Sequence, residues 1–156
     1  MKRTFTLWIA LLIGLATFAQ QALWDRAPVV SPEIHPDRTV TFRLKAPKAV
    51  RVQITGDFLP PRKIQTPRGE AETSGLAELT ETDDGVWEYT TPEPLLSELY
   101  SYAFIADDLK MLDPANTNVN RDVATLSNIF LVGGGQGDLY KVNEVPHGTI
   151  AKVWYD

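Results

Sequence analysis

The chain contains no cysteine, and this absence excludes several kinds of protein at once. Without thiols there is no disulfide scaffold, no cysteine nucleophile, and no cysteine-bound zinc or iron–sulfur site. A lipid-anchored bacterial lipoprotein is excluded too, because it needs a cysteine at its mature N-terminus. Positive charge is also scarce: 15 Lys and Arg stand against 20 Asp and Glu, a formal net charge of −5. We therefore expect no nucleic acid among the partners, since phosphate contacts need clustered cations.

Motifs that carry catalysis are missing as well: there is no G-x-S-x-G, no H-E-x-x-H and no Walker-type phosphate loop. His35 and His147 stand alone, and a histidine without a partner is more often a surface or capping residue than a base. Asp83-Asp84 and Asp107-Asp108 lack the alternating spacing of a calcium loop and are interpreted as turns. Gly133–Gly137 looks like a nucleotide signature, but no helical period follows it, so we interpret it as a flexible exit from the last strand. We expect no catalytic residue, no metal and no cofactor in this chain.

Residues 1–19 are predicted to be a secretory signal peptide. Lys2 and Arg3 form a basic start, residues 5–18 form an uncharged apolar run, and the small residue Ala19 closes the pattern. The alternative, a transmembrane anchor, needs about 20 apolar residues, more than this run provides. Cleavage after Ala19 predicts a periplasmic or secreted protein that has no contact with the membrane once the peptide is removed.

Apolar and polar residues alternate along much of the remaining chain, whereas an apolar stripe at helical spacing is absent. Such alternation predicts strands with one buried face. The expected core strands are residues 39–45, 50–55, 86–91, 100–106 and 129–132. Tyr100, Tyr102 and Phe104 share one face of their strand and are expected to pack in the same core. Several short strands with turns between them favour an all-β fold, a β-sandwich.

The connecting segments are expected to hold little regular structure. Two prolines restrict residues 29–37 to an edge strand or an extended arm. Residues 56–85 are interpreted as a long surface excursion with at most a short strand at 76–82, because proline and glycine recur along them. Residues 113–122 are interpreted as an Asn-rich loop, which Asp113 is expected to order through side-chain-to-backbone hydrogen bonds.

The order and spacing of these segments are similar to those of a known family. The matching stretches are residues 30–33, 37–47, 50–52, 56–58, 84–90, 100–104 and 113–116. Together they resemble the immunoglobulin-like early-set N-terminal domain of secreted bacterial carbohydrate esterases of the feruloyl and acetyl-xylan type, a relative of the family-48 carbohydrate-binding module. The resemblance covers roughly residues 24–156. It implies an immunoglobulin-like β-sandwich over residues 20–137, followed at 138–156 by the linker and first strand of a hydrolase domain absent from this chain.

The resemblance also bears on glycan binding. In the starch- and glycogen-binding members two tryptophans and a lysine form a sugar platform, and Pro61, Ala103 and Lys110 stand near those places here. The resemblance thus implies that the platform is lost, which makes binding of α-glucans doubtful. Trp87 follows a tight turn and is expected to be a core anchor rather than a sugar platform. The residues implied for any surviving carbohydrate-binding face are Phe58, Trp87, Lys110 and Asn128.

Residues 145–155 resemble the segment that leads into the esterase's hydrolase domain. Because Ile150, Val153 and Trp154 are apolar, the segment is expected either to fold back onto the sandwich or to continue into a second domain, and we favour the second. The function implied is a non-catalytic N-terminal module that orients an α/β-hydrolase domain and shapes its cleft for a plant cell-wall polysaccharide. The alternatives are a stand-alone secreted carbohydrate-binding module and an interaction module that pairs with another protein by strand addition.

Overall fold

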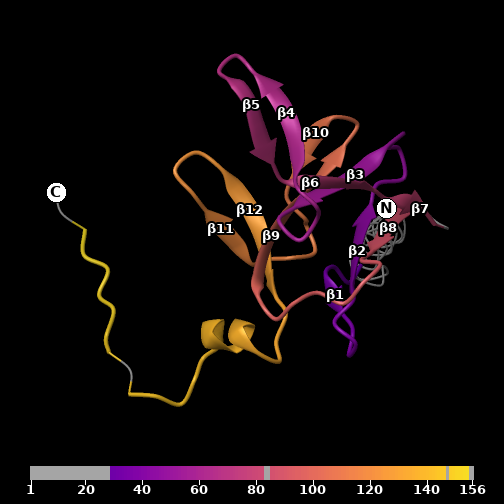
Figure 1. The fold of residues 1–156 in the computed structure, drawn as a ribbon. Coiled ribbons are helices and arrows are strands. Elements are labelled where there is room, and N and C mark those ends of the chain that lie inside the picture. Colours follow the sequence, from indigo (N-terminus) through magenta and orange to yellow (C-terminus); the bar gives the residue numbers. More distant parts are fainter. Residues whose placement is uncertain (1–28, 83–84, 147, 155–156) are drawn as a thin grey trace, which may run out of the picture.

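The computed structural model describes residues 29–82, 85–146 and 148–154, and most of its regular structure is β-strand (Figure 1). The predicted signal peptide, the Asp83-Asp84 pair and His147 lie outside the described residues. Within the described part no helix is long and apolar enough to cross a membrane.

Two antiparallel sheets build the fold, and they confirm the predicted all-β, immunoglobulin-like β-sandwich. The first sheet has the order β1-β2-β8-β7, formed by β1 (Glu33–Ile34), β2 (Val40–Lys45), β8 (Val86–Thr90) and β7 (Thr80–Glu81). The second has the order β11-β12-β9-β3-β6, formed by β11 (Val119–Arg121), β12 (Leu126–Leu131), β9 (Leu99–Ala106), β3 (Val52–Gly56) and β6 (Gly75–Glu78). The short β10 (Leu109–Met111) also pairs with β9. A separate hairpin, β4 (Arg62–Thr66) and β5 (Gly69–Thr73), and the 3-10 helix η2 (Gln136–Tyr140) complete the regular structure of the described residues.

The core lies between the sheets and follows the predicted alternation. Residues at alternate positions of β2, β3 and β9 turn inward and are almost completely buried: Val40, Phe42, Leu44, Val52, Ile54, Tyr102 and Phe104. The Phe42 ring lies at the centre, 4.9 Å from the Tyr102 ring and 5.3 Å from the Phe130 ring, both edge-on. Such contacts add about 0.5–1.5 kcal/mol per pair to the burial itself.

Trp87 is a core residue, as expected. Its side chain is 8% exposed, and its indole Nε1–H donates a hydrogen bond to the Ala46 carbonyl at 3.0 Å. The register pairs Trp87 with Leu44 across β2 and β8, so the ring packs against the strand that supplies much of the core. A buried indole needs a hydrogen-bond partner for its N–H, and the connection between β2 and β3 supplies one.

The predicted turn at Asp107-Asp108 is confirmed. Both residues have positive φ angles, 46° and 68°, which aspartate tolerates better than most residues, and they close the β9–β10 hairpin. The Asp107 carboxylate also accepts hydrogen bonds from the N–H groups of Val50 and Arg51, each at 2.9 Å. The turn therefore fixes the entrance to β3 as well as its own hairpin.

Several connecting segments differ from the sequence-based expectation. The edge strand within residues 29–37 is present as β1, but the predicted excursion at 56–85 contains the regular hairpin β4–β5. That hairpin is almost entirely exposed, so its residues show no apolar alternation from which it could be predicted.

Other segments differ as well. The predicted loop at 113–122 contains β11. Val50 was placed in a core strand but is 87% exposed, because β3 begins two residues later. The Gly133–Gly137 stretch is not a flexible exit: it enters η2 and is hydrogen-bonded to the sandwich.

Candidate functional site

The outer face of the second sheet carries the clearest candidate site. Because Tyr102 and Phe104 point inward, their neighbours Ser101 and Ala103 point outward on β9. The register places Thr55 of β3 directly beside Ala103. Polar side chains therefore gather on the outer side of the strands whose inner side builds the core.

A hollow of about 110 Å³ lies on this face, and most of its lining is polar. Its polar lining comes from β3, β9, β10, β12 and the end of the β4–β5 hairpin: Thr55, Thr73, Ser74, Ser101, Lys110 and Ser127. The hydroxyl groups can both donate and accept hydrogen bonds, whereas the lysine ammonium only donates. The hollow thus suits a ligand that carries several hydroxyl or carbonyl groups.

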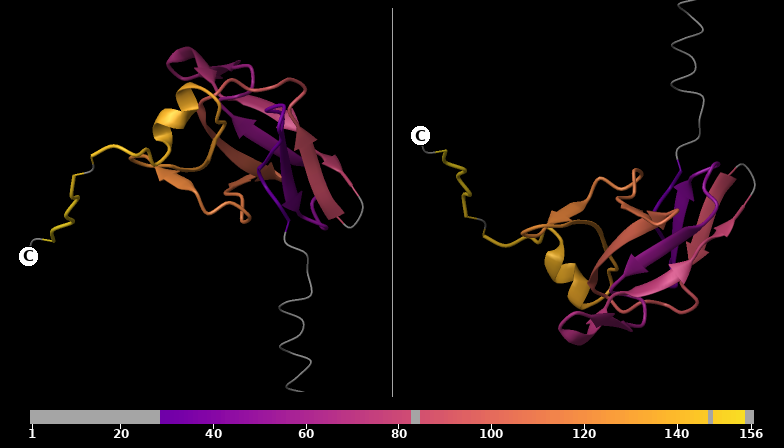
Figure 2. Two further views of the ribbon diagram at one scale, coloured as in Figure 1. Left: turned by 90° about the horizontal axis from the view of Figure 1, so that it is seen from below. Right: turned by 90° about the horizontal axis from the view of Figure 1, so that it is seen from above.

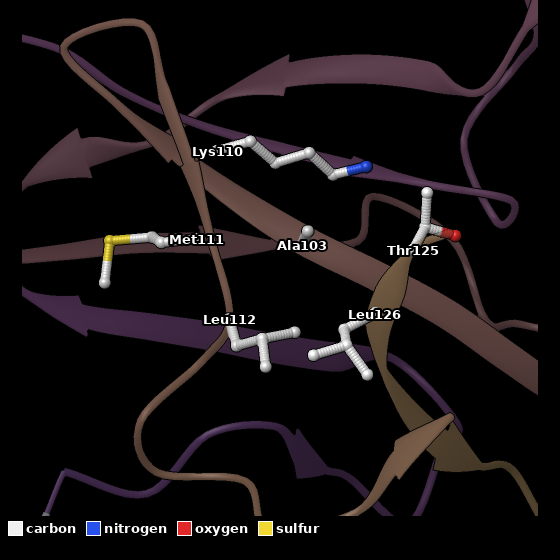
Figure 3. A pocket seen from close by; sticks show the side chains of 6 residues that line it. All are labelled: Ala103, Lys110, Met111, Leu112, Thr125 and Leu126. Carbon is white, nitrogen blue, oxygen red and sulfur yellow. The ribbon is translucent and has the colours of Figure 1, made fainter. Parts of the chain in front are cut away.

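A second, mostly apolar hollow of about 260 Å³ adjoins the first (Figure 3). It lies where β10 ends and β12 begins, next to β9, and Leu112 and Leu126 point toward one another across it. Lys110 and Ala103 line both hollows, and the Lys110 side chain extends toward Thr125 at the upper rim. The exposed Lys110 ammonium therefore lies between the apolar hollow and the hydroxyl groups of the polar hollow.

Neither hollow offers an aromatic face for stacking on a sugar ring. Tyr102 lines the polar hollow, but its side chain is 2% exposed and its hydroxyl donates to the Asp113 carboxylate at 2.8 Å. Burial raises the pKa of Tyr102 far above its ordinary value, so the phenol remains a donor at any physiological pH. Recognition at this face would depend on hydrogen bonds rather than on stacking.

A buried polar network supports the site from behind. The Asp113 carboxylate accepts hydrogen bonds from the hydroxyls of Ser31 at 2.6 Å and Tyr102 at 2.8 Å. The Asn128 side-chain carbonyl accepts the Asp113 N–H at 2.7 Å, and its amide donates to the Asn116 carbonyl at 2.8 Å. Asp113 Oδ1 accepts the Ala115 N–H at 2.8 Å, which confirms that Asp113 orders the loop that follows it. A fully satisfied network of this kind fixes the position of β12 relative to β9.

The structure does not bring together the four residues implied for glycan binding. Lys110 is exposed on the outer face, but Asn128 is completely buried and serves the network just described. Trp87 lies in the core, and the half-buried Phe58 ring stacks on Phe42 with 5.1 Å between the ring centroids. Asn128 occupies an inward position of β12, so its amide faces backbone groups instead of solvent.

The hydroxyl residues of the polar hollow were missed by sequence reasoning. Thr55 and Ser101 occupy outward positions of predicted strands, so their exposure on one side of a sheet could be inferred. Their proximity to Ser127 and Lys110 could not, because it depends on the order of β3, β9, β10 and β12 in the sheet.

Metal binding and histidine chemistry find little support in the described residues. No group of three or more His, Asp or Glu side chains in that part of the chain could hold a metal ion. The His35 Nε2 atom lies 2.8 Å from the Thr41 hydroxyl, which links the residue after β1 to β2. His35 thus has the Thr41 hydroxyl as a hydrogen-bond partner and is half-buried.

The C-terminal residues 148–154 do not fold back onto the sandwich (Figures 1 and 2). Ile150 is 98% exposed and Trp154 is 81% exposed. The Lys152 ammonium lies 4.6 Å from the centre of the Trp154 ring, a cation–π contact within the segment itself. Of the two fates expected for this apolar segment, packing against its own sandwich is not observed.

Comparison with known proteins gives distant structural likenesses only. No family model matches the chain, and no curated protein matches its sequence. The pullulanase SAP of Group B Streptococcus is 16% identical, with a TM-score of 0.47 over 69% of this chain and 15% of that chain. A pullulanase of Anoxybacillus sp. LM18-11, complexed with maltotetraose, is 19% identical, with a TM-score of 0.43 over 83% of this chain and 16% of that chain. The chain thus spans about 15% of the length of these proteins, and likenesses at this level assign it neither a ligand nor an activity.

Proposed function

We propose that the chain is the non-catalytic N-terminal module of a secreted carbohydrate esterase. In this proposal residues 1–19 direct export to the periplasm or the medium, and residues 20–137 form the sandwich. Residues 138–156 then lead into an α/β-hydrolase domain, which supplies the nucleophilic serine and its partners. The module orients that domain and shapes one wall of its cleft for a plant cell-wall polysaccharide.

One observation carries this proposal: apolar side chains are concentrated in the segment after the sandwich, where most of their surface is exposed. Beyond η2, Val142 is 95% exposed, Ile150 is 98% exposed and Trp154 is 81% exposed. Burial of apolar surface contributes about 25 cal/mol per Å². A partner domain that covered these side chains would therefore be held to the module by their burial. The sandwich has a continuous buried core of its own, although Val50, Leu109 and Val123 on its surface are also exposed.

The face around Lys110 supports the part of the proposal that concerns glycans. A polysaccharide presents hydroxyls that the serines and threonines of the polar hollow can bind, and an acyl substituent is apolar enough for the neighbouring apolar hollow. The same face favours a second candidate function, a stand-alone secreted carbohydrate-binding module. In both functions Lys110 contacts the ligand, and only the first requires a hydrolase domain.

Reading the gene beyond codon 156 separates the two functions. The esterase-module proposal expects an open frame that encodes a strand, a G-x-S-x-G turn and a helix, the arrangement that exposes a catalytic serine. A stop codon directly after Asp156, together with secreted protein of this size, would contradict the first function and leave the stand-alone module.

A further inference from the structure

The strongest unexplained feature outside the candidate site is the contact between η2 and the start of β9. Gly137 is buried, and its N–H donates hydrogen bonds to the Ser97 carbonyl at 3.2 Å and the Ser97 hydroxyl at 3.1 Å. A Cβ atom on Gly137 would lie 2.3 Å from the Val132 carbonyl oxygen. Since that neighbour is backbone and cannot easily give way, only glycine fits at this position.

Ser97 joins three separate parts of the chain. Its hydroxyl donates to the Val132 carbonyl at 3.0 Å and accepts the Gly137 N–H. Next to it, the Val132 N–H donates to the Glu98 carbonyl at 3.0 Å. The segment before β9, the end of β12 and the helix η2 are therefore fastened to one another at a single point.

The segment is also braced internally. The Asp138 carboxylate accepts the Gly134 N–H at 3.1 Å and pairs with the Lys141 ammonium, which lowers the pKa of Asp138. The Asp138 N–H donates to the Gly135 carbonyl at 3.1 Å, and the Asn143 side-chain amide donates to the Lys141 carbonyl at 3.0 Å. Residues 133–143, which we call the latch, thus hold a defined shape although they begin with three glycines.

We infer that the latch is a positioning device that fixes the direction in which the chain leaves the sandwich. A glycine-rich linker normally behaves as a flexible coil, and a domain attached through it would swing freely. Here the residues up to Asn143 are bonded to the sandwich or to one another, so the chain does not become a coil directly after its glycines. Gly137 and Ser97 are the positioning residues. The inference deepens the proposed function, a module that orients its neighbour, and gives that orientation a structural cause.

The test uses the absence of native cysteine, because two introduced cysteines become the only labelling sites. Nitroxides are attached at K48C, on the sandwich surface, and at V142C, on the latch, and electron–electron double resonance measures the distance between them. We expect one narrow distance peak in the chain with native Gly137. Gly137→Ala opens the latch and should broaden the peak at least about twofold, as expected for a coil-like connection.

Gly148→Ala is the matched control, since no atom lies within 4 Å of the Cβ that it would add. It should leave the peak unchanged. If Gly137→Ala lowers the yield of folded protein, Ser97→Ala removes the hydroxyl bonds without adding an atom and should broaden the peak as well. Thermal unfolding of each variant checks that the sandwich is retained. A broad peak with native Gly137, or a peak that stays narrow in both folded latch variants, would overturn the inference. The measurement needs no hydrolase domain, so its result is independent of whether the proposed function holds.

Discussion

Asn128 and Lys110 show how the phase of a strand decides the role of a single side chain. Both were grouped as glycan contacts, yet Asn128 is 0% exposed and bonds to backbone groups of the 113–116 loop, whereas Lys110 lies on the outer face between two hollows. Alternation predicts that neighbours along a strand face opposite ways, but it assigns a face only where the strand is correctly placed. The predicted strand began at residue 129, after Asn128, so the sequence offered no phase for it.

Replacing Asn128 tests the buried network. Asn128→Ala removes the acceptor of the Asp113 N–H and the donor to the Asn116 carbonyl, and leaves both groups buried without a partner. We expect the free energy of unfolding to fall by about 1–3 kcal/mol, measured by urea denaturation. The exposed Asn120→Ala is the control and should change it by less than about 0.5 kcal/mol. Equal effects of the two variants would contradict a structural role for the network.

Replacing Lys110 tests the outer face as a glycan site. In native gels that contain acylated xylan, the chain should be retarded, and Lys110→Ala should abolish most of the retardation because the ammonium serves both hollows. Lys48→Ala removes an equal charge from an exposed turn that lines neither hollow, and it controls for electrophoretic mobility. Retardation that survives in Lys110→Ala, or that is lost equally in Lys48→Ala, would contradict a glycan site at Lys110.

At the scale of the element, the sequence was informative wherever a strand buries one face. The alternation in β2 placed Val40, Phe42 and Leu44 correctly in the core. The hairpin β4–β5 was not predicted, because an exposed two-stranded ribbon needs no apolar face and is stabilised by its own ladder. The prediction of a flexible exit at Gly133–Gly137 was wrong for a related reason. Three glycines favour flexibility in isolation, whereas here the contact with Ser97 gives the segment a fixed conformation.

The first sheet is predicted to weaken in acid. Arg43 on β2 bonds the carboxylates of Glu33 on β1 and Glu88 on β8, each at 2.6 Å, and thereby lowers the pKa of Glu33. A lowered pKa in the folded state adds stability that is present above the unfolded value, about 4.3, and is lost as the pH falls through the folded value. The melting temperature should therefore drop as the pH falls below about 4.3, with a shallower drop in Glu33→Gln. Parallel curves for the two proteins would show that this ion pair does not contribute.

At the scale of the whole molecule, the chain consists of the sandwich, the latch that is hydrogen-bonded to it, and the exposed apolar residues that follow. The sequence predicted the sandwich and the segment, since both follow from apolar patterning, but it could not predict how they are joined. That join depends on contacts between residues about 40 positions apart, such as Gly137 with Ser97. In the proposed function, the latch is the part of the module that holds the neighbouring domain in place.

The most direct test is the activity of the product of the full reading frame on acylated xylan and on a small soluble ester. If the chain is an esterase module, the product releases carboxylic acid from both substrates, because the hydrolase domain acts on each. Lys110→Ala should then lower kcat/KM about tenfold on the polymer, where binding to the module raises the local substrate concentration, and leave the soluble ester unaffected. No release of acid from either substrate, or an equal loss on both, would contradict the proposal.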